Sequence, residues 1–274
     1  MTIAAGATVA ALQAGLPLDP LENRILLCHA LGLTRVGLIT NSERVLNQDE
    51  AARLAALVRR RQEGEPIAYI VGQREFFGLP FQVTPAVLIP RPDTELIVEL
   101  ALERLAPRAR LLDMGTGSGA IAVAVAHTRP DAVVTALDVS EDALALARAN
   151  AAANGAQVRF LRSDWFTALG DEVFDLVASN PPYIASGDEH LAQGDLRFEP
   201  SGALTDFADG LSALRTIIDG APAHLVADGW LLLEHGYDQA AAVRVLLSDA
   251  GYAEVQSWRD LGGIERVSGG RRRG

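Results

Sequence analysis

Apolar side chains recur at helical spacing in the first part of the chain. Two stretches carry the pattern, with residues three or four positions apart: Leu21, Ile25, Cys28 and Leu31, then Leu54, Leu57 and Val58. Each stretch follows a capping signal, the run Asp19–Glu22 before the first and the pair Asn47 and Glu50 before the second. Side-chain oxygens at such positions accept hydrogen bonds from the free N–H groups of a new helix. The pattern predicts a small helical N-terminal domain over residues 1–65.

The pattern changes between residues 66 and 92. Aromatic and β-branched residues are interrupted there by turn formers at Gly78, Pro80, Pro85 and Pro90. Proline interrupts helices and sheet ladders, and glycine favours turns. The stretch predicts a short hairpin or extended connector, and we expect residues 66–92 to be a hairpin linker between two domains.

Short apolar runs alternate with helical stretches from residue 93 onwards. The runs of strand length are Leu111–Leu112, Val133–Leu137, Phe160–Leu161, Leu176–Ala178 and Leu231–Leu233. Helical stretches such as Asp93–Leu105 and Glu141–Ala153 accompany them, and the alternation continues toward the C-terminus. This order is typical of an α/β domain whose mostly parallel sheet is covered by helices on both faces. We expect one such domain over residues 93–274.

Composition and charge restrict the kind of protein. With 49% hydrophobic and 22% charged residues, the chain can bury a full core. Its formal net charge of -11 argues against stable nucleic-acid binding, which depends on clustered lysine and arginine. The single cysteine, Cys28, lies in an apolar run and is expected to be a buried structural side chain. The sequence has neither a basic leader nor an apolar run of bilayer length, so we expect a cytoplasmic protein without membrane contact.

A glycine-rich turn follows the first strand-like run. Glycines there let the backbone approach a nucleotide-like ligand closely, at the start of a helix. The spacing is G-x-G-x-G rather than the G-x-G-x-x-G of dinucleotide enzymes, and Asp113 precedes it. A carboxylate would repel pyrophosphate but would suit the ammonium group of a methionine moiety, which favours S-adenosylmethionine over a dehydrogenase cofactor. The expected binding residues are Asp113, Gly115, Thr116, Gly117, Ser118 and Gly119.

Two further carboxylates follow the next strand-like runs. Asp138 ends the second run, where its oxygens could accept both ribose hydroxyls. Asp164 follows the third run and could accept the adenine amino group, while Trp165 offers an aromatic face to the base. Ligands bind open α/β sheets at the carboxyl ends of the strands. Asp113, Asp138 and Asp164 therefore predict one shared cofactor site.

The fourth run leads directly into Asn180, Pro181, Pro182 and Tyr183. Two successive prolines donate no backbone hydrogen bonds, so this turn offers acceptors without donors. A planar NH₂ group could donate one hydrogen to the Asn180 side-chain oxygen and one to the Pro181 carbonyl, while Tyr183 packs on its flat face. Accepting both N–H bonds pushes electron density back onto nitrogen. Because a sulfonium is an excellent leaving group, no metal and no strong base are needed. We expect Asn180, Pro181 and Tyr183 to be catalytic, Asn180 also to contact the cofactor, and all four residues to hold the target.

The motifs in this order resemble the class I methyltransferases that act on exocyclic or amide nitrogens. The segments at residues 72–78 and 88–95 are similar to the PrmC/HemK protein-glutamine methyltransferases of class 1 peptide chain release factors, as are Glu199–Pro200, Ala203–Leu204 and Asp209–Leu211. The resemblance extends to Arg266–Val267. It implies a Rossmann-like domain with a mostly parallel seven-stranded sheet, a helical domain that recognises the substrate, and methylation of the glutamine in the Gly-Gly-Gln motif of release factors. The expected partner is a class 1 release factor, and a monomer is expected.

Other readings stay open at this point. A sister family modifies glutamine in a ribosomal protein and carries the same tetrapeptide; the segment Arg91–Glu95 is the main distinction. A DNA adenine methyltransferase ranks lower because the chain is acidic. A binder that only holds a nucleotide would share the glycine turn without the transfer chemistry. Residues 184–198 carry no feature that predicts a role.

Overall fold

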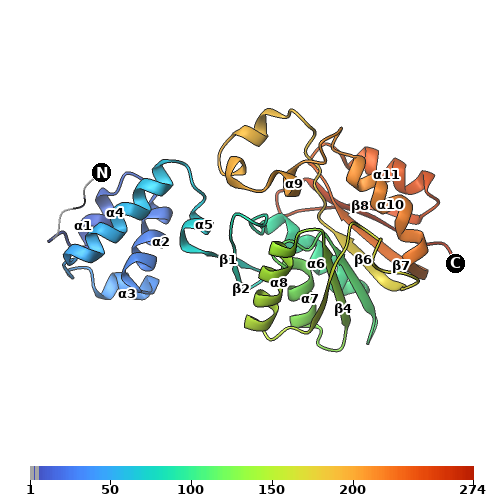
Figure 1. The fold of residues 1–274 in the computed structure, drawn as a ribbon, viewed down its shortest axis with the longest axis horizontal. Coiled ribbons are helices and arrows are strands. Elements are labelled where there is room, and N and C mark those ends of the chain that lie inside the picture. The colour runs from blue at the N-terminus through green and yellow to red at the C-terminus, as the bar shows by residue number, and fades with distance from the viewer. Residues whose placement is uncertain (1–2, 4–5) are drawn as a thin grey trace. The chain divides into compact units, whose positions relative to one another are not determined.

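The chain divides into two compact units, Met1–Gly72 and Gln73–Gly274 (Figure 1). The structure, a computed structural model, describes residue 3 and residues 6–274. Among the described residues, no helix has both the length and the apolar character that a bilayer crossing requires. Each unit has its own core and is described separately.

The first unit is helical, as predicted. Its helices are α1 (Val9–Gly15), α2 (Pro20–Leu31), α3 (Arg35–Thr40), α4 (Gln48–Gln62) and α5 (Ile67–Val71). The Asp19 carboxylate caps α2 by accepting from the Leu21 N–H at 2.7 Å, and Asn47 and Glu50 form a reciprocal capping box on α4. Helix α2 packs against both α1 and α4, which encloses a core that includes Leu26, Leu54 and Val58.

Helix α5 corrects the predicted start of the linker. The expectation placed residues 66–92 in a hairpin linker, but Ile67–Val71 is helical and Ile70 packs in the core of the first unit. Pro66 precedes the first turn, where a missing N–H does no harm, and Gly72 ends the helix with φ +75°. Pro66 and Gly72 therefore mark the two ends of a short helix and do not interrupt it.

The predicted hairpin is present and opens the second unit. Strands β1 (Gln73–Phe76) and β2 (Leu79–Gln82) pair antiparallel around the two-residue turn Phe77–Gly78, both of which have positive φ. Phe76 and Phe81 are buried in the core of this unit.

A seven-stranded sheet forms the centre of the second unit. Its strands are β3 (Arg110–Met114), β4 (Val133–Asp138), β5 (Val158–Arg162), β6 (Phe174–Ser179), β7 (Leu225–Glu234), β8 (Ala253–Arg259) and β9 (Glu265–Arg271). They lie in the order β5-β4-β3-β6-β7-β9-β8, and β9 runs antiparallel to both neighbours while the other pairs are parallel. The mostly parallel α/β sheet predicted from the sequence is confirmed. The chain reverses direction across the sheet between β3 and β6, the switch point at which such sheets bind ligands.

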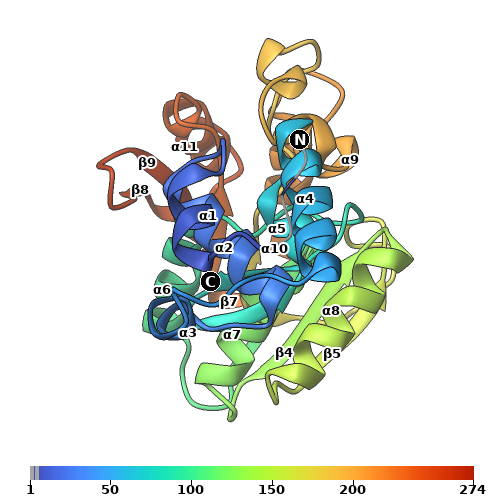
Figure 2. The same ribbon diagram turned by 90° about the vertical axis from the view of Figure 1, so that its left-hand side faces the viewer.

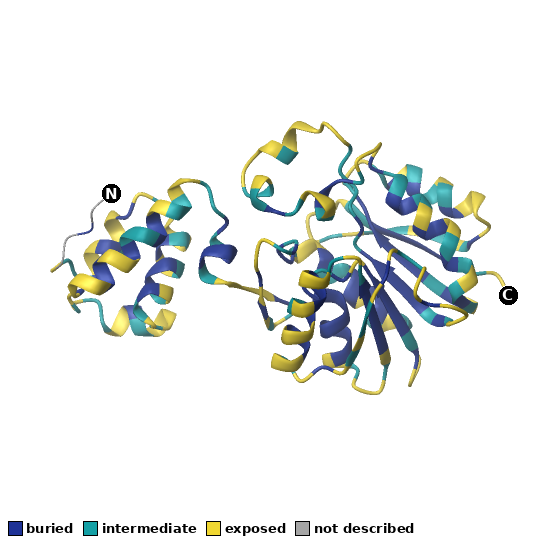
Figure 3. Cartoon of the chain, viewed as in Figure 1, coloured by how far each residue is buried: buried dark blue, intermediate teal, exposed yellow. Residues whose placement is uncertain are grey.

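Helices cover both faces of this sheet (Figures 1 and 2). The helical elements of this unit are η1 (Pro92–Thr94), α6 (Glu95–Arg104), α7 (Ala120–Thr128), α8 (Glu141–Ala153), η2 (Glu189–Ala192), η3 (Leu196–Phe198), α9 (Ser201–Leu204), α10 (Ser212–His224) and α11 (Ala240–Asp249). Successive residues of β3 point to opposite faces, so Leu111 packs with α6 and α7 while Leu112 packs with α10 and α11. The central strands β3 and β6 are buried almost throughout, whereas the edge strands β5 and β8 contain only partly buried and exposed residues (Figure 3).

The last two strands depart from the predicted alternation. Strands were expected to alternate with helices toward the C-terminus, but β8 and β9 follow one another through residues 260–264 without a helix. An antiparallel pair needs only a tight turn, whereas a parallel pair needs a crossover. Helix α6 likewise begins later than predicted, because Pro92–Thr94 forms a separate 3₁₀ turn.

Candidate active site

A cavity of about 580 Å³ lies in the second unit at the carboxyl ends of the parallel strands. The predicted site residues that line it are Gly115, Thr116, Gly117, Ser118, Asp138, Asp164, Trp165, Asn180 and Pro182. Four other predicted residues do not line it: Asp113, Gly119, Pro181 and Tyr183. The fold thus gathers residues from four strand ends in one place and puts the remaining four behind the cavity wall.

The glycine turn between β3 and α7 leaves the backbone bare toward the cavity. Gly115 and Gly117 have φ of +69° and +55°, and a Cβ on either would meet nothing within 4 Å. Gly119 is different, since a Cβ there would lie 3.2 Å from both the Ala147 Cβ and the Val123 Cγ2. The first two glycines therefore make room for a ligand, and the third lets α7 pack closely against α8.

Asp113 lies beneath this turn and is fully buried. Its Oδ2 accepts from the Thr116 hydroxyl at 2.6 Å and from the Ala122 N–H at 3.2 Å, so the carboxylate holds the turn against the start of α7. Its Oδ1 is buried and has no hydrogen-bond partner among the described residues. Burial raises the pKa of Asp113 to about 7, against the effect of those two hydrogen bonds. In this structure the side chain supports the loop rather than facing the cavity.

This raised pKa predicts an unusual pH dependence of folding. Between the ordinary carboxyl pKa near 4 and the folded value near 7, the folded protein holds a proton that the unfolded chain has lost. Asp113 therefore lowers the free energy of unfolding as the pH rises through this window, by at most about 1.4 kcal/mol per pH unit. Asp113→Asn, which cannot ionise, is expected to gain stability relative to the unmodified protein from pH 5 to 7, with no further gain above.

Urea unfolding of the cofactor-free protein at several pH values measures this difference. Asn keeps an oxygen for Thr116 and Ala122 and places its NH₂ where Oδ1 has no partner, so the substitution is close in shape. The exposed Asp171→Asn is the matched control. Parallel stability curves for Asp113→Asn and the unmodified protein would mean that Asp113 is ionised in the fold.

Asp138 at the end of β4 does line the cavity. Its Oδ2 accepts from the Gly117 N–H at 2.9 Å, and its Oδ1 accepts from the Ser140 N–H at 2.9 Å. Each carboxylate oxygen has a second lone pair, so both can still accept a hydroxyl from a ligand. One side chain thus fixes the glycine turn and offers two acceptors beside it.

The residues after β5 form the next part of the wall. Asp164 is exposed and Trp165 is partly buried, packed against the apolar core beneath the sheet. Trp165 has φ +45°, a conformation that costs energy in a residue other than glycine. The Ser163 hydroxyl donates to the Trp165 carbonyl at 2.7 Å and accepts from the Ala168 N–H at 3.0 Å, which holds this strained turn.

Asn180 lies at the cavity directly after β6. Its Nδ2 donates to the Thr94 hydroxyl oxygen at 3.2 Å. This bond uses one hydrogen of Nδ2, and the side-chain oxygen is left as an acceptor for a ligand. Pro182 lines the same part of the cavity, and Pro181 is buried next to it.

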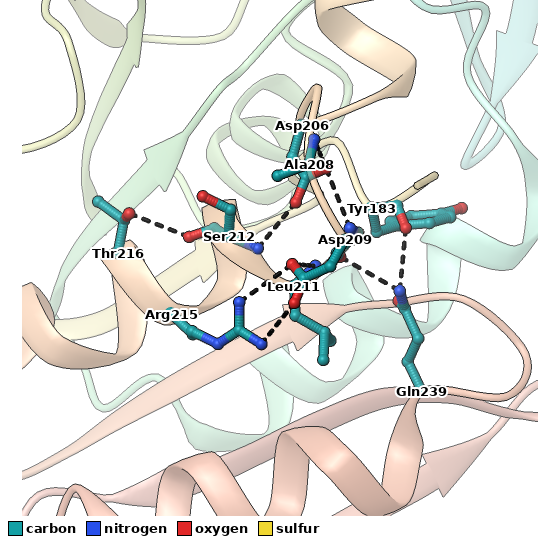
Figure 4. A network of polar contacts seen from close by, with 10 residues as sticks. Tyr183, Asp206, Ala208, Asp209, Leu211, Ser212, Arg215, Thr216 and Gln239 are labelled. Carbon is teal, nitrogen blue, oxygen red and sulfur yellow. Dashed lines mark hydrogen bonds and ion pairs between the residues drawn. The ribbon is translucent and has the colours of Figure 1, made fainter. Parts of the chain in front are cut away.

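Tyr183 points away from the cavity into the protein. Its ring packs against the apolar core that α10 and α11 form with one face of the sheet. Its hydroxyl donates to Glu234 Oε1 at 3.4 Å. Its carbonyl accepts from Gln239 Nε2 at 2.9 Å, and the same nitrogen donates to the Gly210 carbonyl at 3.2 Å (Figure 4). The tyrosine thus anchors the turn that carries Asn180.

A loop held by Asp206 lies beside this turn (Figure 4). Asp206 Oδ1 accepts from the Ala208 N–H at 2.9 Å and from the Gly210 N–H at 3.0 Å, and Oδ2 accepts from the Ser212 N–H at 2.8 Å. The same loop carries Phe207, which lines the cavity and is exposed with φ +57°. A single carboxylate therefore shapes this side of the cavity and begins α10.

Gly210→Ala tests how closely this loop supports the tetrapeptide turn. Gly210 has φ +81°, and an added Cβ would lie 2.6 Å from the Tyr183 carbonyl oxygen and 2.9 Å from Gln239 Nε2. We expect a loss of about 2–3 kcal/mol in the free energy of unfolding. The control is Gly251→Ala, where φ is +85° but nothing lies within 4 Å. Equal stability losses in the two variants would mean that only backbone strain matters.

Sequence reasoning gave no role to several residues that build this site. Glu199 has a fully buried side chain, accepts from the Ile89 N–H at 3.0 Å and forms an ion pair with Arg91. It ties the segment at residues 88–95 to the chain beyond the tetrapeptide. These residues were noted only as resemblances, and Gln239 had no signal because its partners are distant in sequence. Most of the unassigned stretch 184–198 is exposed, with the 3₁₀ turns η2 and η3.

The sheet topology, the bare glycine turn and the acceptor-rich cavity define a methyltransferase that uses S-adenosylmethionine. Comparison with known proteins agrees. The family model "Methyltransferase small domain" matches residues 93–198, and "PrmC N-terminal domain" matches residues 6–72. Proteins named release factor glutamine methyltransferase are 57% and 55% identical to this chain over almost its whole length, so the chain belongs to that family.

The similarity to these relatives extends over almost the full length of both proteins. The chain is 57% identical to "Release factor glutamine methyltransferase" of Burkholderia pseudomallei, covering 97% of this chain and 96% of that protein. It is 55% identical to the protein of the same name from Bordetella pertussis, covering 93% and 95%. A solved methyltransferase from Pyrococcus furiosus shares the fold, with a TM-score of 0.56 and 21% identity over 78% of this chain and 97% of that one.

Proposed function

We propose that this protein transfers the methyl group of S-adenosylmethionine to the side-chain amide nitrogen of the glutamine in the Gly-Gly-Gln motif of class 1 release factors. The observation that carries the proposal is the orientation of Asn180, whose nitrogen is held by Thr94 and whose oxygen is left to accept. An amide NH₂ needs acceptors in its own plane, and a donor in that position would repel it.

The cavity fits the methyl donor that the class requires. Gly115 and Gly117 leave open space beside the turn, and Asp138 has free lone pairs for two ribose hydroxyls. We assign the loop Gly115–Gly119, Asp138, Asp164 and Trp165 to the cofactor, with Asn180 beside its reactive end. Asp113 supports this loop from beneath. When bound, the cofactor supplies a methyl group on a positively charged sulfur.

The residues of this chain would activate the target by orientation. An amide nitrogen is a weak nucleophile because its lone pair is delocalised into the carbonyl. Asn180 Oδ1 accepts one N–H, which raises the electron density on nitrogen and helps to fix the plane of the amide. The Pro181 carbonyl, expected from the sequence to accept the other N–H, belongs to a residue that does not line the cavity. Pro182 shapes the wall beside it, and Tyr183 keeps the turn in place. The surplus proton leaves to water after transfer.

The helical unit is proposed to recognise the release factor. It has its own core and the capped helices predicted from the sequence. We further propose that the protein acts as a monomer in the cytoplasm, without stable nucleic-acid binding, since its net charge is -11 and release factors work at the ribosome. Light scattering of the purified protein tests the monomer.

Mass spectrometry tests the function. A class 1 release factor incubated with the protein and S-adenosylmethionine is expected to gain one methyl group on the peptide that holds the Gly-Gly-Gln motif. The control is the same release factor with that glutamine changed to alanine, which should gain none. Parallel incubations with ribosomal protein and with duplex DNA test the alternatives. Transfer to either of these in the absence of transfer to the release factor contradicts the proposal.

A further inference from the structure

Two buried polar side chains contact the residues proposed to hold the target amide; Thr94 also lines the cavity, and Glu234 does not. Thr94 ends the 3₁₀ turn η1 and is 4% exposed, and Glu234 ends β7 and is 1% exposed. Thr94 binds the Asn180 amide nitrogen, and Glu234 binds the Tyr183 hydroxyl. The two ends of the tetrapeptide turn are therefore each held by one buried oxygen-bearing side chain from another element.

Thr94 determines which atom Asn180 presents. An asparagine amide can rotate by a half turn and exchange its acceptor for its donor with almost no change in shape. The Thr94 hydroxyl oxygen accepts from Nδ2 at 3.2 Å, and its own hydrogen is then free for another acceptor. The Thr94 hydroxyl also lowers the pKa of the buried Glu234 carboxyl. Because an amide nitrogen only donates, the direction of donation runs from Asn180 to Thr94.

Glu234 is suited to receive donors from two sides. Its Oε1 accepts from the Tyr183 hydroxyl at 3.4 Å, and its Oε2 is buried and has no hydrogen-bond partner within the ranges 3 and 6–274 that the structure describes. An oxygen left alone in the protein interior is costly and attracts any nearby donor. Burial raises the pKa of Glu234 to about 7, whereas Thr94, Arg266 and Tyr183 lower it. The carboxyl thus keeps the Tyr183 hydroxyl turned toward itself.

We propose that Thr94 and Glu234 are positioning residues that set the orientation of Asn180 and Tyr183, so that the cavity presents an acceptor rather than a donor to the target nitrogen. This inference rests on the proposed function and deepens it. Neither residue is catalytic, because neither is proposed to touch the reacting atoms. They act on the rate through the side-chain amide of Asn180.

Thr94 also connects the segment at residues 88–95 with the tetrapeptide turn. Thr94 belongs to the segment at residues 88–95, which the Glu199 contacts with Ile89 and Arg91 hold in place. A shift of that segment would move the hydroxyl away from Asn180. Since a displacement of about 1 Å can cost on the order of 10²-fold in rate, small changes here should appear in kcat.

Substitution of Thr94 provides the test. Thr94→Val keeps the shape but removes the hydroxyl, and it is expected to lower kcat by about 10- to 100-fold with the KM for S-adenosylmethionine unchanged. Thr94→Ser keeps the hydroxyl and should restore most of the rate. The matched control is Thr135→Val, which removes a buried hydroxyl from β4 outside the cavity and should leave kcat unchanged. If Thr94 had only a general structural role, Thr94→Val would instead lower the free energy of unfolding and change both kcat and KM.

A double-mutant cycle with Asn180 separates positioning from structure. If Thr94 acts through Asn180, then Thr94→Val should have no further effect on kcat in an Asn180→Ala background. Additive losses would overturn the proposal. Glu234→Leu is expected to lower kcat as Thr94→Val does, and Glu234→Gln, which keeps one acceptor oxygen, should retain more of the rate. If Thr94→Val does not fold, the comparison of Glu234→Leu with Glu234→Gln tests the proposal instead.

A readout that needs no substrate distinguishes this proposal from the proposed function. The side-chain NH₂ resonances of Asn180 in ¹⁵N-labelled protein are identified by their loss in Asn180→Ala. They should exchange with solvent faster in Thr94→Val than in Thr94→Ser or Thr135→Val. Unchanged exchange in Thr94→Val overturns the positioning role even if the enzyme is active. Absence of methyl transfer by the unmodified protein overturns the proposed function, and the Asn180 resonances still decide the role of Thr94.

Discussion

Asn180→Ala is expected to lower the rate of methyl transfer by about 10²- to 10³-fold, the usual cost of losing one group that stabilises charge in a transition state. The substitution removes the side-chain oxygen that faces the cavity and also frees the Thr94 hydroxyl that held the amide. Cofactor affinity should stay close to that of the unmodified protein, because Asp138 and the glycine turn remain. The loss is therefore expected in kcat.

Single-turnover transfer to a release factor measures the rate, and calorimetry with S-adenosylmethionine measures the affinity. Asn154→Ala is the matched control, since its amide nitrogen also donates to the protein but lies outside the cavity. Full activity in Asn180→Ala would contradict the proposed activation of the amide. A loss of cofactor binding as large as the loss of rate would place Asn180 mainly in the cofactor site.

Glu199→Ala is expected to lower the free energy of unfolding by about 2–3 kcal/mol, because it leaves the Ile89 N–H without its acceptor and Arg91 without its partner. Breaking a fully buried pair costs more, but the Arg91 side chain is 32% exposed and can turn to water. Burial raises the pKa of Glu199 despite the nearby guanidinium, so this carboxyl is held at a cost that its two contacts offset. Methyl transfer should fall as well, since residues 88–95 carry Thr94.

Urea unfolding measures the stability change. The control is Glu172→Ala, which breaks an ion pair with Arg159 whose side chains are 47% and 44% exposed, and which should change stability by less than about 1 kcal/mol. Glu199→Gln keeps an acceptor for Ile89 and should lie between the two. A Glu199→Ala protein as stable as Glu172→Ala would mean that the segment is held by its apolar contacts alone.

The general positions of the site residues could be predicted from the sequence because each motif is local. Asp138, Asp164 and Asn180 all follow strand-like runs, and parallel strands bring their carboxyl ends to one edge. The glycine spacing likewise follows from the backbone freedom that a tight strand-to-helix turn needs. These inferences depend on neighbours within a few residues, and the cavity lining confirms their common location.

Side-chain direction could not be predicted in the same way. Asp113 and Tyr183 stand within two residues of positions that line the cavity, yet both face the protein interior. Successive residues at a strand end point to opposite sides, and the partner that draws a side chain inward can come from any part of the fold. For Tyr183 that partner is Glu234, which is 51 residues away in the sequence.

The sequence by itself determined the helical start, the hairpin, the mostly parallel α/β sheet and the order of the methyltransferase motifs, because hydrophobic spacing and turn residues act over short distances. Only the tertiary structure decided how the tetrapeptide is held. The contacts from Thr94 to Asn180 and from Glu199 to Ile89 span 86 and 110 residues. Such contacts depend on which elements the sheet brings together, and a hydrogen bond forms only when distance and direction are both met.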